Sequence, residues 1–479
     1  MATGSTVNEE KTEGLLLGNP SPSLMTSLDS FRILWKNSDG MKVLGILFFT
    51  DFTETQRRNW IRLKEEMQEY LSNSRSRLLS LKGRVLVLNT VVLARIWYMA
   101  TVITPLKEEK NAMIRLIFDF LWQIGLQENR CKDPIKRNMV YQPRDKGGLN
   151  LKNMDLQIKA LQLKFTRDIV DPDCTHPWVH LARFWIGFRL APLHPDWTFL
   201  RNNNTPHLNI TANVPSSFYK DLLRDVRGLD LTDFEWLTPA IYRVLMRETP
   251  EVPKAWEFWQ FHGGTLSRLF THVHRTPARG SHQDVMYKYI HRIHATAYFK
   301  FIRFSGGDNF GAHTRFCARC PTQVENLFHC FISCPAATRV WDVIYPTLEV
   351  LHRGDPFRIS RLLINTHENN LPIAVRRMIT TILQIALHRI WINRNTFTKE
   401  SRYVSLNQSL AQIKLEFNRA IRKQFVRLPL VKFREQYCHT PDVCRVENDT
   451  TLVTNVYCNP NPGGHGHLHH IFPPSRHVR

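Results

Sequence analysis

Four potential metal ligands lie close together in the C-terminal half of the chain. Cys317, Cys320, His329 and Cys334 form the pattern C-x2-C-x8-H-x4-C. Thiolates and imidazoles are ligands that Zn2+ prefers, and four of them complete a tetrahedral shell. Because a closed shell leaves no position for a reactive water, the pattern predicts a structural zinc site and a binding module, not a catalytic centre.

Two alternatives remain open for this segment. In the first, the cysteines are unrelated buried residues and His329 is a surface residue at a turn; in the second, His313 replaces one of the ligands. The chain has nine cysteines in 479 residues, and four of them fall between 317 and 334, which favours a shared ion. Cys330, beside His329, is expected to be a small buried apolar residue.

The charge balance indicates a polyanionic partner. The chain has 64 Lys and Arg against 42 Asp and Glu, a net charge of +22, which is typical of proteins that bind nucleic acid. Two runs contain no acid, one between Glu69 and Glu108 and one between Glu416 and Glu435. We expect RNA or DNA to contact the first run through Arg75, Arg77, Lys82, Arg84 and Arg95. The second run holds Arg419, Arg422, Lys423, Arg427, Lys432 and Arg434. For either run alone, a solvated helix face is the alternative.

Composition also bounds the compartment and the class of protein. A content of 43% hydrophobic residues is typical of a folded chain of two or three domains. The first residues lack the basic and apolar regions of a signal peptide, and the cysteine usage fits a reducing compartment. The stretch from Val85 to Ala100 is interrupted by Asn89 and Arg95, so we expect a buried helix and not a membrane span. These features predict an intracellular protein, in the nucleus or the cytoplasm, with no membrane partner.

Hydrophobic periodicity predicts a mainly helical fold with a short β element at the N-terminus. Residues 8–18 and 41–49 are expected to be strands, and apolar residues recur at three- and four-residue spacing from Thr55 onward. Further helices are expected at 283–305 and Val375–Asn395. Between them, Trp341 is expected on the first helix after the cysteine loop. The expected organisation is 1–54, a β remnant; 55–170, a helical bundle; 171–279, a linker; 280–345, the zinc segment; 346–440, a helical region; and 441–479, a disordered tail.

The order of several motifs resembles the C-terminal half of the reverse transcriptase of non-LTR (LINE-type) retrotransposons. The resemblance covers residues 8–165 and 280–395. In chain order, the motifs that carry it are NEEKTEGLLLG, MKVLGILFF, RNW, LSLKGRVLVLNTVVLARIWYMATVITP, FDFLW, PRDKGGLNLKN and CARCPTQVENLFHCFISC with a following Trp.

The resemblance implies a palm end, a thumb and a zinc-binding segment. Asn8, Lys11 and Gly18 would lie in the palm, just after the catalytic strand. Leu44, Gly45 and Ile46 would form the hairpin that grips the primer end. Residues 55–165 would be the thumb, with Lys82 and Arg84 facing the template-primer backbone, and the zinc segment would bind RNA or the target site.

The departures from this family concern catalysis. Polymerisation requires carboxylates that hold two Mg2+ ions, which the family provides as an adjacent Asp pair upstream of the NEEK-like motif. This chain has no Asp-Asp dipeptide and only seven residues before Asn8. We therefore expect a truncated reverse transcriptase fragment that binds RNA or DNA and Zn2+, without polymerase activity of its own and without a small-molecule substrate. Mg2+ would belong only to the full-length family enzyme. A retained cellular scaffold protein and one part of an active polymerase in trans remain the alternatives.

Overall fold

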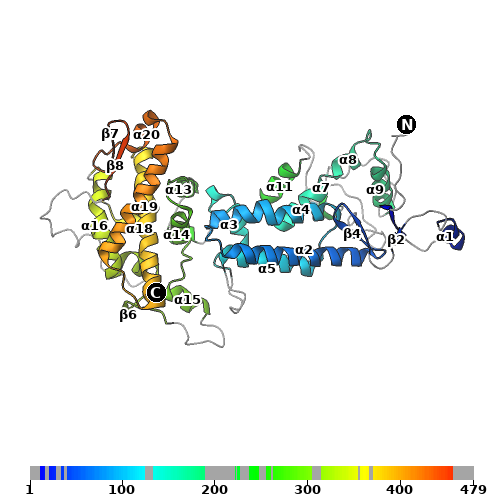
Figure 1. The fold of residues 1–479 in the computed structure, drawn as a ribbon, viewed down its shortest axis with the longest axis horizontal. Helices are drawn as coiled ribbons and strands as arrows, with labels where there is room; N and C mark the ends of the chain where they lie inside the picture. The colour runs from blue at the N-terminus through cyan, green and yellow to red at the C-terminus, as the bar shows by residue number, and fades with distance from the viewer. Residues whose placement is uncertain are drawn as a thin grey trace. The chain divides into compact units, whose positions relative to one another are not determined.

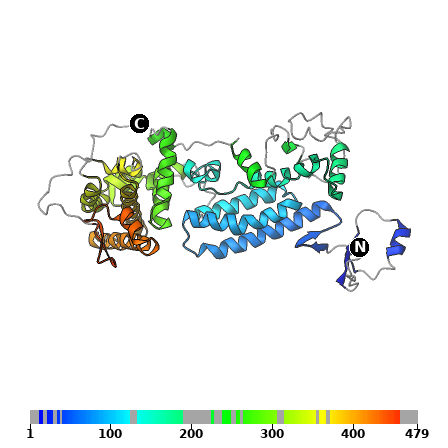
Figure 2. The same ribbon diagram turned by 90° about the horizontal axis from the view of Figure 1, so that it is seen from above.

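The computed structural model divides the chain into two compact units that are mainly helical, which confirms the predicted fold class. It describes residues 11–16, 21–28, 34–36, 40–123, 133–188, 222, 224–226, 237–247, 255–259, 263–304, 314–353, 357–365 and 371–456. The first unit comprises Met1–Leu78, Arg84–Lys132 and Leu151–Pro250, and the second comprises Leu79–Gly83, Asp133–Asn150 and Glu251–Arg479. Figures 1 and 2 show the elements of both.

The two units differ in their elements. The first contains β1 (Glu13–Leu15), α1 (Pro22–Leu28), β2 (Leu34–Lys36), β3 (Met41–Val43), β4 (Ile46–Phe48), α2 (Phe52–Arg75), η2 (Leu88–Val92), α4 (Leu93–Val102), α5 (Lys107–Trp122), α7 (Met154–Leu163), α8 (Thr166–Val170), α9 (Pro177–Phe188) and α11 (Thr238–Arg247). The second contains α6 (Arg137–Tyr141), η3 (Arg144–Lys146), α12 (Ala255–Trp259), α13 (Gly263–His274), α14 (Gly280–Ile290), α15 (Ala297–Phe304), β5 (Phe316–Cys317), β6 (Cys320–Val324), η5 (His329–Ser333), α16 (Pro335–Leu351), α17 (Ile359–Asn365), α18 (Ile373–Glu400), α19 (Leu406–Arg427), α20 (Leu430–Tyr437), β7 (Cys444–Glu447) and β8 (Thr451–Thr454). Helix α3 (Leu81–Val87) is divided between the two units, with its first three residues in the second unit and the rest in the first.

The N-terminal strands differ from the prediction in one respect. Strand β1 pairs in parallel with β2, whereas residues 41–49 form the antiparallel hairpin β3–β4 and not a single strand. The chain reverses at Leu44 and Gly45, whose φ angles of 49° and 86° are those of a tight two-residue turn. Arg62 Nη2 donates to the Gly45 carbonyl at 2.7 Å, and the Tyr98 hydroxyl donates to the Leu44 carbonyl. Of the residues assigned to the palm, Asn8 and Gly18 lie outside the described residues.

The helices of the first unit form a bundle, as the periodicity from Thr55 predicts. Helix α2 packs against α5, and α4 packs against α7 (Figures 1 and 2). Asp51 caps α2 by accepting from the Thr53 amide at 2.9 Å. The stripe of Trp60, Leu63 and Met67 is almost fully buried, so this face of α2 builds the core.

One apolar stretch in this region is long enough to cross a membrane. Within the described residues, Leu81–Val102 is the span that meets this test by length and composition, with a mean hydropathy of 1.7. Its Leu88, Val92 and Ile96 side chains are at most 2% exposed within the protein. Only 39% of the apolar window in this span is buried, however, and Leu86 and Tyr98 are 61% and 53% exposed. One face of this helix therefore packs in the core, and the predicted buried helix is confirmed for that face alone.

Residues 171–279 are more than a linker. Part of the segment lies outside the described residues, but Leu222, Val226 and Leu245 are buried in a cluster with residues of α7, α8 and α9. The hydroxyl of Tyr242 accepts from the Asn153 amide at 2.9 Å, at the start of α7. The sequence signal was weak because Pro, Asn and Trp interrupt the periodicity, although the buried side chains share one core.

The second unit is organised around α18, the helix predicted at Val375–Asn395, which extends to Glu400. Helices α14, α16, α19 and α20 pack against it, and Figure 1 shows α18 and α19 side by side. The single helix expected at 283–305 is divided into α14 and α15, because Arg292 adopts a φ of 57°. Trp259 Nε1 donates to the Ile290 carbonyl at 2.8 Å, which satisfies the end of α14.

The region expected to be a disordered tail contains a hairpin. Strands β7 and β8 pair antiparallel, and Asn448 and Asp449 take positive φ angles of 49° and 58° in the turn. These turn formers lowered the sequence signal, but Cys444 and Val456 are fully buried. Residues 441–456 therefore belong to the folded unit; the remainder of the expected tail lies outside the described residues.

Candidate metal centre

A hairpin and the start of a helix position the four predicted ligands. Cys317 and Cys320 are cross-strand partners in the β5–β6 hairpin. His329 begins the helical turn η5, and Cys334 follows its end as the N-cap residue of α16, with Pro335 in the first turn. The Cys334 amide donates to the His329 carbonyl at 2.8 Å, so backbone hydrogen bonding fixes the spacing of these two ligands.

The ligand atoms lie close enough together to share one metal ion, and one of their distances matches an edge of a tetrahedral zinc site. One atom from each of the four residues lies within 4.8 Å of the others. The Sγ atoms of Cys320 and Cys334 are 3.8 Å apart. A tetrahedron with Zn–S bonds of about 2.3 Å has sulfur–sulfur edges of about 3.8 Å. Within the described part of the chain, His329 Nε2 is buried without a hydrogen-bond partner, a cost that a bound cation would offset.

Hydrogen bonding and burial shift the pKa values of the three thiols. A hydrogen bond with Cys334 is the main reason that the pKa of Cys317 is lowered to about 3, and the same hydrogen bond raises the pKa of Cys334. Burial is the main cause that raises the pKa of Cys320. A divalent cation bound among them would stabilise the three sulfurs as thiolates.

This geometry rules out one of the two alternatives to a shared metal site in the cysteine segment. His329 is 7% exposed and lies among the three sulfurs, so the alternative with a surface histidine and unrelated cysteines is wrong. Cys330 is fully buried and is not among the gathered ligands, as predicted. His313, the alternative ligand, lies outside the described residues.

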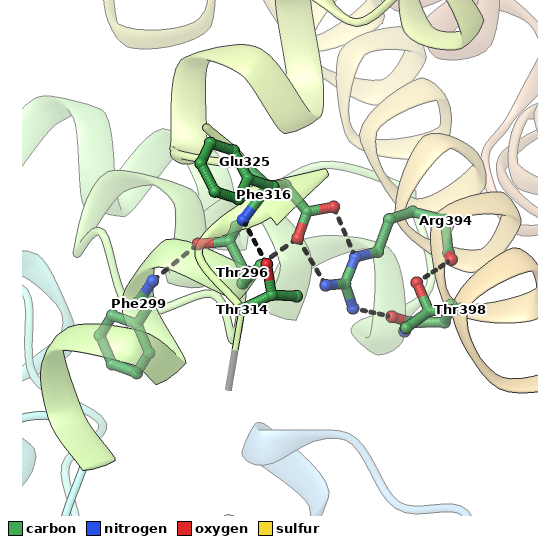
Figure 3. Close-up of polar contacts among 9 residues, drawn as sticks. Thr296, Phe299, Thr314, Phe316, Glu325, Arg394 and Thr398 are labelled. Carbon is green, nitrogen blue, oxygen red and sulfur yellow. Dashed lines mark hydrogen bonds and ion pairs between the residues drawn. The ribbon is translucent and has the colours of Figure 1, made fainter. Parts of the chain in front are cut away.

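A buried ion pair anchors the loop that carries the four ligands, residues 317–334, to α18. Arg394 Nε and Nη2 donate to the two carboxylate oxygens of Glu325, at 2.9 and 2.5 Å (Figure 3). The Ala297 amide also donates to Glu325, at 2.7 Å, and the next residue, Asn326, accepts from the His329 amide at 2.8 Å. Sequence reasoning missed this pair, although an acid in a cysteine loop and an arginine on an apolar helix were the available signals.

The structure separates the five predicted nucleic-acid contacts. Arg77, Lys82 and Arg95 are exposed and Arg75 is half-buried. Arg95 also lies 3.9 Å from the carboxylate of Glu66.

Arg84 differs from the other four. It is only 8% exposed, and its Nη1 donates to the Leu121 carbonyl inside the first unit. The prediction that Arg84 faces a phosphate backbone is therefore wrong, because its guanidinium is buried and bonded to a backbone carbonyl in the core of the first unit.

The second basic run lies in the unit that holds the metal centre, and two of its six cations, Arg419 and Arg434, pair with Glu416 and Asp449. Arg422, Lys423, Arg427 and Lys432 are all exposed, and no ion pair involves them within the described residues. Val426 and Val431, which interleave with these cations, are 78% and 70% exposed. We call this set the α19–α20 basic surface.

The chain is distantly similar to a protein encoded by a transposon. No protein-family model matches the sequence. Over 234 residues, 47% of its length, the chain is 26% identical to the Transposon TX1 uncharacterized 149 kDa protein of Xenopus laevis. The match spans 16% of that protein. The chain is thus similar, over about half its length, to a protein encoded by a transposon, and it carries a Cys3His cluster suited to a metal ion.

Proposed function

We propose that the chain is derived from a non-LTR retrotransposon and serves as a zinc-stabilised nucleic-acid-binding protein related to the thumb and zinc segment of a reverse transcriptase. The similarity to a transposon protein supports the origin. The observation that carries the binding function is the α19–α20 basic surface, in the same unit as the metal centre. RNA or DNA is the partner.

In this proposal the metal has a structural role. Its four ligands hold the β5–β6 hairpin against the start of α16, and Glu325 ties the end of the hairpin to α18. Among the described residues this is the one group of His, Cys, Asp or Glu gathered tightly enough to hold an ion. The unit therefore supplies a shaped, positively charged surface, and any polymerase chemistry would come from the Mg2+-binding carboxylates of a family enzyme.

A salt series tests the binding function. The zinc-loaded chain is titrated into a fluorescein-labelled RNA or DNA oligonucleotide at several salt concentrations. We expect affinity to fall steeply with salt, because each phosphate contact releases counterions. Arg422→Ala with Arg427→Ala should reduce the slope by about two, whereas the control Arg57→Ala with Arg58→Ala on α2 should leave it unchanged.

Two results would contradict the proposal. The first is a slope near zero in the wild type. The second is an equal slope in the α19–α20 variant and the α2 control, which would remove the basic surface from the interface. Salt-insensitive binding to a protein would instead favour the scaffold function.

A further inference from the structure

A small cavity lies beside the metal centre in the second unit. Its volume is about 80 Å3, and it is bounded by the turn of the β5–β6 hairpin, the first turns of α16 and α19, and the end of α18. Arg319, between the ligands Cys317 and Cys320, is one wall, and Arg339 of α16 is another. Two cations at one cavity make it suited to an anion.

One edge of the Arg319 guanidinium has an unused pair of donors. Its Nε and Nη2 are buried and make no hydrogen bond within the described residues. Nε–H and Nη2–H point the same way, and this edge grips a carboxylate or a phosphate through two parallel hydrogen bonds. Arg394 provides an internal comparison, because its Nε and Nη2 hold both oxygens of Glu325 (Figure 3). The same edge of Arg319 has no oxygen partner among the described residues, and its charge lies near the sulfurs of Cys320 and Cys334.

The cavity also has an unused acceptor. Ser409 donates its hydroxyl hydrogen to the Ser405 carbonyl at 2.9 Å, so its oxygen accepts from Asn393 Nδ2 at 2.8 Å. This chain of hydrogen bonds fixes the orientation of the Asn393 amide. Asn393 Oδ1 is left buried and without a donor among the described residues. A ligand that satisfies the cavity must bring a hydroxyl or amine donor as well as an oxyanion.

An aromatic pair completes the lining. Tyr403 and Phe397 line the cavity, with ring centroids 4.4 Å apart. Tyr403 is 71% exposed, so its ring is accessible to solvent beside two arginines. Exposed aromatic rings next to cations are the platforms on which unpaired bases stack.

We propose that this cavity binds one nucleotide of a single-stranded RNA, with a phosphate on Arg319 and Arg339, the ribose 2′-hydroxyl donating to Asn393 Oδ1, and the base on Tyr403. The volume suits a phosphate group, which leaves the base at the rim. Within a strand the 3′ oxygen is esterified, so the 2′-hydroxyl is the sugar donor that distinguishes RNA from DNA. This inference rests on the proposed nucleic-acid binding and adds to it a preference for RNA.

The test compares RNA and DNA oligonucleotides of the same sequence by fluorescence anisotropy, using the zinc-loaded chain. The wild type should bind RNA about tenfold more tightly than DNA. Asn393→Ala should weaken RNA binding alone and bring the two affinities together. Arg319→Lys keeps the charge beside the thiolates but removes the paired donors, so it should weaken both RNA and DNA binding about tenfold.

Two further variants separate a loss of RNA binding from a loss of folding. Tyr403→Ala removes an exposed ring and should weaken RNA binding about tenfold with an unchanged melting temperature. Arg315→Lys, on the same hairpin but outside the cavity, is the matched control and should bind like the wild type. Zinc content and melting temperature are measured for every variant.

The outcomes separate this inference from the proposed function. Loss of all RNA and DNA binding in the wild type would overturn both. Salt-dependent binding with equal affinity for RNA and DNA, or with Arg319→Lys and Tyr403→Ala unchanged, would overturn the cavity assignment alone. Displacement of RNA by micromolar 5′-AMP would assign the cavity to a free mononucleotide and overturn the proposal that it binds a nucleotide within an RNA strand.

Discussion

Replacing Cys320 by serine tests the metal centre most directly. Among the three cysteine ligands, Cys320 is the least buried, so Cys320→Ser removes a sulfur ligand with the smallest loss of packing. The four ligand atoms lie within 4.8 Å of one another, which predicts one ion per wild-type chain. A serine hydroxyl is a far weaker ligand than a thiolate, so we expect less than one tenth of the wild-type zinc content after dialysis against a chelator.

The energetic effect follows from linkage. At free zinc one hundred times its dissociation constant, the ion stabilises the folded unit by about 2.7 kcal/mol, and Cys320→Ser should lose this increment. Glu325 and Arg394 still hold the loop, and Trp341 Nε1 still donates to the Phe331 carbonyl at 2.8 Å. We therefore expect residues 315–338 to exchange amide hydrogens faster, while the α2 and α5 helices of the first unit keep their protection.

The chain offers a matched control for this experiment. Cys330→Ala removes a neighbouring thiol that is fully buried but is not a ligand. It should keep one zinc per chain, as measured by inductively coupled plasma mass spectrometry, while losing some packing stability. One zinc bound equally by Cys320→Ser and the wild type would refute the ligand assignment.

Three further predictions concern stability. Arg84→Met should lower the free energy of unfolding of the first unit by about 2 kcal/mol, because it leaves the Leu121 carbonyl without its donor, whereas exposed Lys82→Met should change it little; equal urea midpoints would contradict the buried role. Glu325→Gln should cost about 3–5 kcal/mol by leaving Arg394 buried without a carboxylate, yet keep the zinc; an unchanged melting temperature would show that the pair does not anchor the loop. Burial lowers the pKa of His291 to about 4, whereas the unfolded value is near 6.5. The contribution of His291 to folding stability is therefore fully present above pH 6.5 and should fall by about 1.4 kcal/mol per pH unit as the pH drops from about 6.5 towards 4. In urea titrations at pH 7.5, 6 and 5, His291→Gln should show a shallower decline in stability than the wild type, and parallel curves would contradict this prediction.

The metal centre could be predicted from sequence because its information is local. Cys317, Cys320, His329 and Cys334 lie in one short segment, and a hairpin followed by a helix start brings such spacing together with few alternatives. The long helices were predictable for a similar reason, since Trp60, Leu63 and Met67 recur with the period of one helix face.

Misplaced elements had weak or misleading local signals. A polar, turn-rich segment at 441–456 predicted disorder, but Cys444 and Val456 pack into the second unit. The run at 283–305 has a continuous helical pattern, and its break at Arg292 coincides with a contact from Trp259, which lies far away in sequence.

Sequence alone determined that this chain is basic, mainly helical and equipped with a Cys3His cluster, because charge, periodicity and ligand spacing are properties of neighbouring residues. Only the tertiary structure decided which cations are available to a partner. Arg84 and Lys82 are two residues apart in the same basic run, yet one donates to a buried carbonyl and the other is exposed. The physical reason is that burial and hydrogen bonding depend on what packs against a side chain, and for Arg84 and Arg394 those partners are distant in the sequence.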